Sequence, residues 1–359
     1  MRAPTVSVIM PAYNHAPFVA ESIRSVLTQD YKDLELLVAD DGSPDETVAA
    51  IRATSDPRMQ VFAYEANRGA GVVTRELISR CRGRYIALIN SDDAWLPGKL
   101  SYQVDVLESN AELAAVFGRA RYFDRDGQPV DKSTMQFGAV FDQENRSRGA
   151  WLRRFFDHGN CLCHPTMLIR SEVYREIGTY DNRYRQLPDF EMWVRFIRRW
   201  QFHISDRELI NFRILPGENA SSHTPANSIR TMNEHYMIAR EFFDGVSSEL
   251  LVEAFGDRLV RNPIPSEVHA DIEKALLFFG YNQWLGHMYK VVGVTKLFDL
   301  LASPSHREVL EKDYALDDRA FHKLMGEADA FRPGNPLTLM PGRVLVQELK
   351  RRIRRRLSR

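Results

Sequence analysis

Two aspartates, Asp92 and Asp93, stand side by side in "INSDDAWL", two residues after the apolar run "YIALI". Adjacent carboxylates at the mouth of a buried strand repel one another, so a positive charge is expected beside them. A divalent cation that also holds a phosphate group would supply this charge, because hard cations bind carboxylate and phosphate oxygens together. These residues therefore favour a site for a cation and an anionic ligand.

The elements that would position these acids follow from the pattern of the first half of the chain. Short aliphatic runs predict strands, and they alternate with segments of helical spacing through short connections. The predicted strands are 5–11, 34–40, 59–64 and 85–90, and the predicted helices are 17–29, one from about 44, 71–81 and 97–109. The sequence thus predicts an α/β domain with a Rossmann-like, mostly parallel sheet flanked by helices.

Ligands of such sheets bind beyond the carboxyl ends of the strands. The loops expected there are 11–14, 40–43 and 90–93, which carry aromatic, amide and carboxylate groups. The first loop, "PAYNHAPF", lacks the glycines of a dinucleotide site, and the chain has no G-x-x-x-x-G-K-[ST] run. A phosphoacceptor receiver domain would be much shorter. The kind of site that remains is one in which carboxylates hold a cation and the cation holds a phosphate group.

Five segments, in this order, resemble those of the family 2 glycosyltransferases: "VSVIMPAYN", "VADDGS", "NRGAG", "RYIALINSDDAWLPGKL" and "LPDFEMWVRF". The resemblance covers about residues 5–213, and it is specific because the motifs occur together. It implies a GT-A fold and an inverting, hexosyltransferase-type reaction that uses a nucleotide-diphospho-sugar and Mn²⁺ or Mg²⁺. The expected reaction moves a sugar to a hydroxyl acceptor in polysaccharide or glycolipid assembly.

The resemblance assigns Pro11, Tyr13 and Asp41 to the nucleotide of the donor. The ring of Tyr13 would stack on a pyrimidine. The carboxylate of Asp41 would accept the N3 hydrogen of uracil, which fits UDP or dTDP and disfavours CMP, because N3 of cytosine is an acceptor. The alternatives are a tyrosine that only covers the sheet edge and a "DDGS" turn or helix cap.

The resemblance assigns the cation to Asp93 and the ribose or the sugar to Asp92. The family usually has an acid at the position of Asn90, and an amide there removes one negative charge. We therefore expect a lower affinity for the cation. The alternative, that both acids cap the helix after Pro97, places them several residues too early.

Two arginines after the third predicted strand, Arg68 and Arg75, could bind the diphosphate through their planar guanidinium groups. Arg75 also falls near the amino end of a helix, which favours anions. The family more often has asparagine at the position of Arg75, so this assignment stays open.

The segment "LPDFEMWVRF" would supply the proton acceptor. The resemblance implies that Asp189 is the general base that takes the proton of the acceptor hydroxyl, with Glu191 as the second choice. The family commonly has glutamate where this chain has Pro188. Asp189 would also suit the start of a helix, and the two roles are compatible.

Histidines and cysteines suggest further contacts. The segment "CLCHPTMLIR" predicts a strand with His164 near the acceptor cleft. Cys161, Cys163 and His164 could bind zinc, but a closed zinc site needs a fourth ligand, and no partner pair such as C-x-x-C occurs elsewhere. His223 could contact the diphosphate or the cation, although a lone histidine in a polar loop often does neither.

The alternation of strands and helices stops near residue 216, and helical spacing follows at 228–243 and 266–302. We predict a catalytic domain over 1–215, a helical region over 216–335 and a basic amphipathic tail over 336–359. Such a tail can lie on an anionic membrane surface. A solvated end and an oligomer contact are equally open.

Composition bounds the function. The formal net charge is zero, so nothing supports a nucleic-acid partner. Three cysteines indicate a reducing compartment, and no signal peptide or membrane-spanning run is visible. We expect a cytoplasmic protein, with peripheral contact to the inner face of the membrane as an option.

The expected partners are a nucleotide-sugar donor and a carbohydrate or lipid-linked acceptor. Two rival functions remain. A catalytically inactive sugar-nucleotide-binding protein is suggested by the departures at Asn90 and Pro188. A sugar nucleotidyltransferase would need a basic loop near the amino terminus to bind a triphosphate, and the sequence shows no such loop.

Overall fold

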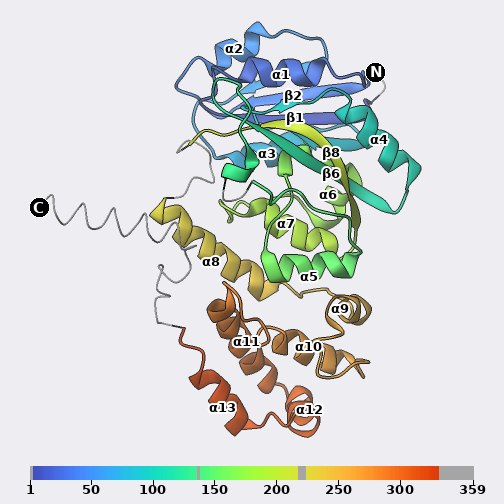
Figure 1. The fold of residues 1–359 in the computed structure, drawn as a ribbon, viewed down its shortest axis with the longest axis vertical. Coiled ribbons are helices and arrows are strands. Elements are labelled where there is room, and N and C mark those ends of the chain that lie inside the picture. The colour runs from blue at the N-terminus through green and yellow to red at the C-terminus, as the bar shows by residue number, and fades with distance from the viewer. Residues whose placement is uncertain (1–2, 136–137, 217–223, 331–359) are drawn as a thin grey trace, which may run out of the picture. The chain divides into compact units, whose positions relative to one another are not determined.

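The computed structural model describes residues 3–135, 138–216 and 224–330 (Figure 1). The chain divides into two compact units, the first ending at Ile238 and the second beginning at Ala239. This division falls inside helix α8 (Pro225–Glu241), whereas the boundary that we predicted near residue 216 precedes that helix. The predicted tail, 336–359, lies outside the described residues.

The first unit contains one eight-stranded sheet in the order β3-β2-β1-β4-β7-β6-β8-β5. Its strands are β1 (Val6–Ala12), β2 (Leu34–Asp40), β3 (Met59–Ala63), β4 (Tyr85–Leu88), β5 (Ala94–Trp95), β6 (Leu113–Phe123), β7 (Leu168–Arg170) and β8 (Gln201–Arg213). The first four strands are parallel, β6 and β8 are parallel, and β7 and β5 run antiparallel to their neighbours. The predicted mostly parallel sheet is confirmed, with limits of its first four strands and their helices close to those expected, and the antiparallel strands β5 and β7 make the sheet mixed.

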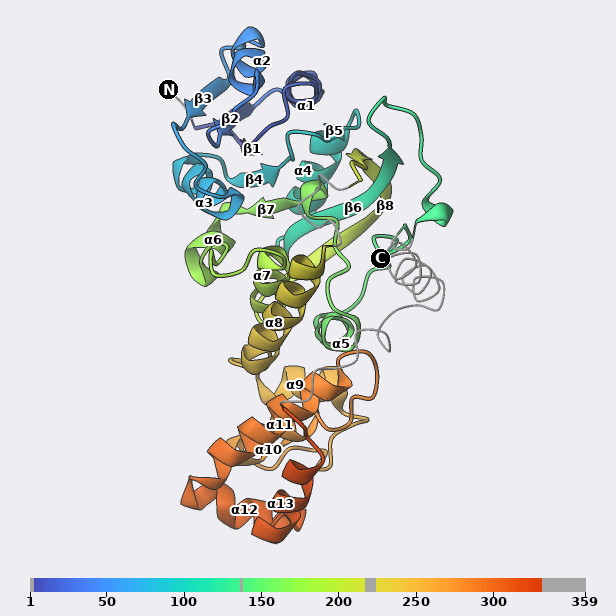
Figure 2. The ribbon, with the colours of Figure 1, turned by 90° about the vertical axis from the view of Figure 1, so that its left-hand side faces the viewer.

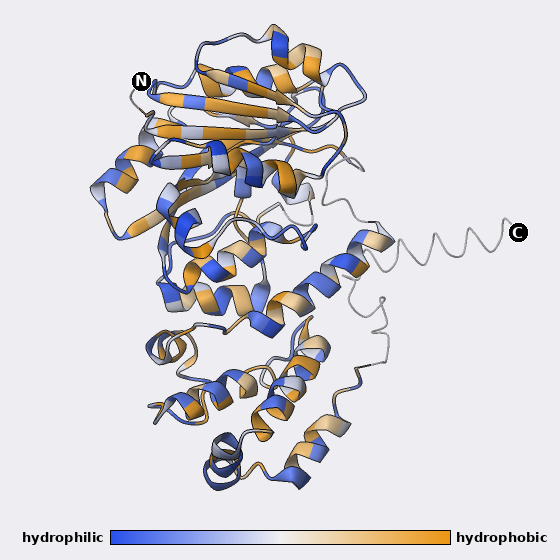
Figure 3. Cartoon of the chain, turned by 180° about the vertical axis from the view of Figure 1, so that it is seen from behind, coloured by the Kyte–Doolittle hydropathy of each residue, from blue (hydrophilic) through white to orange (hydrophobic). Residues whose placement is uncertain are grey.

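Helices cover both faces of the sheet, so its central strands are buried and mostly apolar, with Ser7 in β1 and Glu35 in β2 as buried polar exceptions. Figure 3 shows these strands mostly in the colour of hydrophobic residues, interrupted by short hydrophilic segments. On one face, α1 (Val19–Leu27), α2 (Thr47–Ala53) and α4 (Lys99–Ser109) share a core with alternate residues of β1 and β2. On the opposite face lies α3 (Ala70–Arg80) (Figure 2). The apolar positions of α1, at Val19, Ile23 and Val26, recur three or four residues apart and are buried.

The remaining elements of the first unit are η1 (Lys132–Thr134), α5 (Arg148–His158), η2 (His164–Thr166), α6 (Ser171–Ile177) and α7 (Pro188–Ile197). Helix α7 begins at Pro188, because proline tolerates the first helical position, where its missing N–H costs nothing. Asp189 thus lies in the first turn of the helix rather than at its cap.

The strand predicted over 161–170 is wrong for most of its length. Residues 161–163 are buried but irregular, η2 follows, and only Leu168–Arg170 form β7. Pro165 explains the break, because proline has no N–H to donate to a sheet ladder.

The second unit is helical, as expected. Its helices are α9 (Ser248–Phe255), α10 (Glu267–Leu276), α11 (Gly286–Leu301), α12 (Pro304–Tyr314) and α13 (Asp318–Gly326), and α10 to α13 share one apolar core. The helical spacing read over 266–302 corresponds to α10 and α11 with a break at 277–285. None of the helices within the described ranges is long and apolar enough to cross a membrane.

Gln103 joins α4 to two other parts of the first unit. Its side-chain amide nitrogen donates to the carbonyl oxygens of Val116, at 3.0 Å, and Thr166, at 2.8 Å. Its side-chain oxygen accepts a hydrogen bond of 2.7 Å from the ammonium group of Lys99. Gln103 and Lys99 are both buried, and burial holds the pKa of Lys99 well below its usual value. The amide therefore satisfies buried polar groups that have no access to water.

We predict that Gln103→Leu lowers the free energy of unfolding of the first unit by about 2–4 kcal/mol, because it leaves two buried carbonyl oxygens without this donor. Urea unfolding followed by tryptophan fluorescence measures the change. Asp105→Leu, on the exposed side of the same helix, is the control and should change stability by less than about 0.5 kcal/mol. Equal stabilities of the two variants would contradict the role of Gln103.

Candidate functional site

The carboxyl ends of β1 and β2 are aligned, and the loops that follow them are joined by hydrogen bonds. Ala12 pairs with Asp40 in the sheet register, and the carbonyl oxygen of Ala12 accepts a hydrogen bond of 2.8 Å from the backbone N–H of Asp41. The next residues of the first loop donate to side chains of the second: Asn14 N–H to Ser43 Oγ (2.8 Å), His15 N–H to Thr47 Oγ1 (2.9 Å) and Ala16 N–H to Asp45 Oδ2 (3.1 Å). Pro11 is the next-to-last residue of β1, and the side chain of Tyr13 is 44% exposed.

Asp41 is buried where the loop after β2 meets the loop after β3. Its Oδ1 accepts from the backbone N–H of Arg68 (2.7 Å) and its Oδ2 from that of Gly69 (2.9 Å). Gly42 makes this approach possible, since a Cβ there would lie 2.6 Å from the carbonyl carbon of Ala66, and its φ is +70°. Each oxygen of the carboxylate keeps a lone pair for a further donor.

Asp40 has a different role from its neighbour. Its carboxylate accepts from the backbone N–H of Ser43 (2.9 Å) and from the hydroxyl of the same residue (2.5 Å). This is the turn that "DDGS" suggested as an alternative, and it accounts for the side chain of Asp40 alone.

Asp93 is enclosed by the protein, with 1% of its surface exposed. Its Oδ1 accepts from the backbone N–H of Arg213 (2.8 Å), and its Oδ2 accepts from the side-chain amide of Asn90 (2.9 Å). Burial and the neighbouring charge of Asp92 raise the pKa of Asp93 well above its usual value.

Asp92 has fewer contacts with the protein. Among the described residues its carboxylate has no hydrogen-bond partner on another residue, and the imidazole Nε2 of His15 lies 4.0 Å from its Oδ2. Asp92 is 7% exposed, and burial raises its pKa, while His15 and Arg213 act in the opposite sense. The carboxylate of Asp92 can therefore bind a ligand. The carboxylate of Asp93 has less capacity to do so, because both of its oxygens already accept hydrogen bonds.

Two residues that the sequence analysis did not identify support these acids. His15 shares a hydrogen bond of 2.7 Å between its Nδ1 and the hydroxyl of Ser91, which links the loop after β1 to the loop after β4. Arg213, the last residue of β8, donates from Nε to the carbonyl oxygen of Asp92 (2.8 Å) and forms an ion pair with Glu21 (2.6 Å). The spacing of neither residue in the sequence could have shown these contacts.

Asp189 lies at the amino end of α7 and is held from two directions. Its Oδ2 accepts from the side-chain amide of Asn160 (2.7 Å), and its Oδ1 accepts from the backbone N–H of Phe190 (2.9 Å). The turn before α7 is fixed by Glu234 of α8, whose carboxylate accepts from the backbone N–H groups of residues 185, 186 and 187 at 2.9, 2.8 and 2.7 Å.

Cys163 is a buried residue whose thiol is influenced by acids from two parts of the site. Burial raises the pKa of the Cys163 thiol well above its usual value, and the charges of Asp93 and Asp189 both add to this effect.

Glu191 is engaged elsewhere. Its carboxylate binds the guanidinium group of Arg195 at 2.5 and 2.8 Å, and Arg195 also donates to the carbonyl oxygens of Ile177 and Thr179.

His164 shares a hydrogen bond of 2.7 Å with the hydroxyl of Tyr180, and burial lowers the pKa of its imidazole.

The two arginines differ in their contacts. The side chain of Arg68 forms an ion pair with Glu76 (2.5 Å) and lies over the ring of Tyr64, so its guanidinium group already has a carboxylate partner. Arg75 is exposed on α3 and forms no ion pair or hydrogen bond with another side chain of the described residues. His223 lies outside the described residues.

Within the described part of the chain, no three histidine, cysteine, aspartate or glutamate side chains come together as a set of metal ligands. A cation at the acidic loop would thus take most of its ligands from a bound anion and from water, as Mg²⁺ does when it binds through one or two carboxylates and substrate phosphates.

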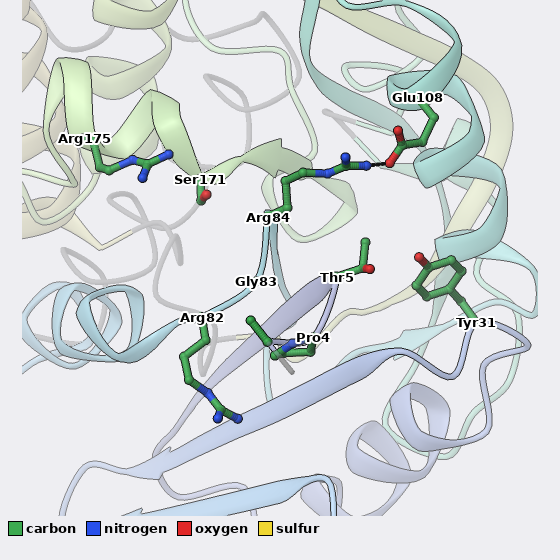
Figure 4. Close-up of a pocket in the computed structure, with 10 residues that line it drawn as sticks. Pro4, Thr5, Tyr31, Arg82, Gly83, Arg84, Glu108, Ser171 and Arg175 are labelled. Atoms are coloured by element: carbon green, nitrogen blue, oxygen red, sulfur yellow. Dashed lines mark ion pairs between the residues drawn. The ribbon is translucent and has the colours of Figure 1, made fainter. Parts of the chain in front are cut away.

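A cavity of about 630 Å³ lies at the other end of the strands (Figure 4). It is lined by Thr5 before β1, by the residues 82–84 that lead into β4, and by Ser171 at the start of α6. Figure 4 shows Arg84 directed at Glu108, with which it forms an ion pair, and Arg82 is paired with the buried Glu35 (2.6 Å). This cavity is separated from the acidic loops by the length of the sheet.

The family model and the relatives by sequence match residues of the first unit. A family model described as Glycosyl transferase family 2 matches residues 7–178. An uncharacterized glycosyltransferase of Rickettsia prowazekii is 28% identical over 215 residues, which is 59% of this chain and 64% of that protein. The putative glycosyltransferase EpsE of Bacillus subtilis is 31% identical over 198 residues, which is 54% of this chain and 66% of EpsE. The chain therefore spans less than two thirds of the length of these relatives.

The fold is also found among solved structures. The structure of residues 1–349 of S. aureus TarS in complex with UDP-GlcNAc superimposes with a TM-score of 0.56 at 15% sequence identity, and covers 91% of this chain and 93% of that chain. At this identity the likeness concerns the fold, which is the GT-A arrangement of a mixed sheet followed by helices. The chain thus carries a glycosyl transferase family 2 domain, homologous to glycosyltransferases, on a GT-A fold.

Proposed function

We propose that the protein is a cation-dependent, inverting glycosyltransferase that moves a sugar from a UDP-sugar or a dTDP-sugar to a hydroxyl acceptor. The observation that carries the proposal is the carboxylate of Asp92, which is buried at the carboxyl edge of the sheet and has no hydrogen-bond partner on another described residue. A carboxylate in this position could hold a cation together with the diphosphate of a donor, and an inverting transfer also needs a proton acceptor, for which Asp189 is proposed.

The base of the donor would bind at the loops after β1 and β2. The exposed ring of Tyr13 offers a face for stacking, and the free lone pairs of Asp41 can accept the N3 hydrogen of uracil or thymine. Two backbone N–H groups already hold the carboxylate of Asp41, which fixes its direction before the donor arrives. Arg75 has no carboxylate partner on the described residues and remains open for the diphosphate, whereas Arg68 is paired with Glu76.

The residues of the acidic loop fit a divalent cation, and the hydrogen bonds favour Asp92 as its ligand. The family resemblance assigns the cation to Asp93, and that prediction stays open. However, both oxygens of Asp93 accept hydrogen bonds from inside the protein, whereas the carboxylate of Asp92 is largely without partners in a buried position. When bound, the cation would neutralise the charge that develops on the departing diphosphate.

Asp189 would act on the acceptor side. Its carboxylate lies in the first turn of α7 and can take the proton of the attacking hydroxyl group. Glu191 is a poorer proton acceptor, because its two oxygens are bound to Arg195. His164, with a lowered pKa, would contribute polarity to the acceptor cleft without a positive charge.

Polysaccharide or glycolipid assembly, with a carbohydrate or lipid-linked acceptor, remains the proposed setting. The helical second unit and the basic tail would then serve the acceptor or an anionic membrane surface. A hexose is the proposed sugar.

Incubation with a panel of nucleotide sugars and Mn²⁺ tests the proposal. A competent site should hydrolyse its donor slowly in the absence of an acceptor and release the nucleoside diphosphate. Binding without hydrolysis would favour the inactive sugar-nucleotide-binding protein. Release of pyrophosphate from UTP and a sugar phosphate would favour a nucleotidyltransferase.

We predict that Asp92→Asn weakens the binding of UDP in the presence of Mn²⁺ by about tenfold or more, because it removes the charge that faces the ligand. Asp93→Asn should have a smaller effect, since the amide of Asn90 can turn to offer its oxygen to the new amide. Isothermal titration calorimetry with and without EDTA measures both. A larger loss of UDP binding in Asp93→Asn than in Asp92→Asn would assign the cation to Asp93.

We predict that Asp189→Asn keeps the binding of the donor and slows its turnover by about two to four orders of magnitude, the usual contribution of a general base. The rate of nucleoside diphosphate release measures the effect, and calorimetry checks donor binding. Glu191→Gln serves as the matched control. A large loss of turnover in this control, with full activity in Asp189→Asn, would transfer the role of the base to Glu191.

Deletion of residues 342–359 should reduce sedimentation of the protein with liposomes that contain phosphatidylglycerol and should leave donor hydrolysis unchanged. Liposomes of phosphatidylcholine alone are the control, because they lack the negative surface charge. Equal sedimentation of the full chain and the shortened chain would remove the membrane from the proposal.

A further inference from the structure

Among the described residues, the side chain of Asn160 is the one that donates to the carboxylate of Asp189. The bond from Asn160 Nδ2 to Asp189 Oδ2 is 2.7 Å long, and the bond from the adjacent Phe190 N–H to Oδ1 is 2.9 Å long. The second bond comes from the next residue of the same chain segment. Asn160 is therefore the group from outside α7 that fixes the rotation of the carboxylate.

The orientation of the Asn160 amide is set by a second bond. The side-chain oxygen of Asn160 accepts from the backbone N–H of Leu162 at 3.2 Å, and only an oxygen can accept there. The amide must then present its NH₂ group to Asp189. Gly159 ends α5 with a φ of 75°, and its N–H donates to the carbonyl oxygen of Phe155 at 3.0 Å, which anchors the backbone beside Asn160.

The other titratable groups around Asp189 give its charge little support. Burial raises the pKa of Cys163 and of Tyr180, with a smaller contribution from the charge of Asp189, and burial lowers the pKa of His164, so these three neighbours are neutral near pH 7. The charged groups nearby are committed to other partners. They are Glu191 and Arg195 on α7, which bind each other, and Glu234 on α8, which binds the backbone before α7; His235 on α8 packs against Phe190.

We propose that Asn160 is a positioning residue for the general base. Its NH₂ group holds one oxygen of Asp189 and leaves the other lone pairs of the carboxylate directed at the acceptor hydroxyl. The bond also places a neutral donor, and not a second acid, beside the carboxylate that takes the proton. The inference rests on the proposed function, since it concerns the base of that reaction.

The test uses the full chain, Mn²⁺ and the fastest hydrolysed donor among UDP-glucose, UDP-galactose, UDP-N-acetylglucosamine and UDP-glucuronate. Asn160→Ala should lower kcat by about 10- to 100-fold and leave the KM for the donor unchanged, because the lost bond is charge-assisted and lies away from the nucleotide. Asn160→Asp keeps the shape and the bond to Leu162 but places a second carboxylate beside Asp189. The acid limb of the pH–rate profile of Asn160→Asp should therefore move upward by about one pH unit or more.

Asn145→Asp is the matched control. Asn145 also accepts a backbone N–H and donates to a carbonyl oxygen, both of Ile204 (2.6 and 2.8 Å), but it does not contact Asp189. Asn145→Asp should lower the melting temperature of the protein and leave the acid limb of the pH–rate profile unchanged. A shift in Asn160→Asp alone supports the proposal, and an unmoved acid limb in that variant overturns it, whatever the loss of rate.

The same experiment separates this inference from the proposed function. Asp189→Asn is measured in parallel. If it keeps full activity, or if no donor is hydrolysed, the assignment of the base or of the reaction fails. If it loses activity while both Asn160 variants behave as wild type, only the role of Asn160 fails.

Discussion

A buried arginine holds the acidic loop in place, and the rest of the site depends on it. The side chain of Arg213 is 2% exposed and donates to the carbonyl oxygens of Asp92, Asp124 and Arg125, while its backbone N–H binds Asp93. A buried charge is tolerated only when it is paired and hydrogen-bonded, and Glu21 supplies the opposite charge. Because four parts of the chain meet at this guanidinium, the two acids cannot move independently of β8.

The edge of the sheet could be predicted because it depends on local patterns. Apolar runs predict buried strands, and the carboxyl ends of parallel strands lie at one edge, so the meeting of the loops at Asp41 and Asp92 follows from the sequence. The contacts of Arg213, His15 and Asn160 could not be predicted in this way. Their partners lie 121, 76 and 29 residues away, and nothing in the local spacing selects one partner over another.

The two departures from the family pattern have local explanations. The amide of Asn90 donates to Asp93, which a carboxylate at that position could not do without a proton. Pro188 occupies the first position of α7, where it costs no hydrogen bond. By contrast, the strand expected at Cys161 to Met167 failed because the apolar residues there are buried without pairing, and burial alone does not distinguish a strand from an irregular segment.

The short strand β5 has a consequence for self-association. It pairs with the long strand β8 at Ile210 and Asn211, Leu96 after it donates to the carbonyl oxygen of Leu209, and the nearby residues 206–208 of β8 are exposed and charged. An open strand edge invites another chain to add a strand, and charges at such an edge oppose this addition. The sheet thus ends in a margin that discourages edge-to-edge aggregation, while the loop that forms β5 carries the acids of the proposed donor site.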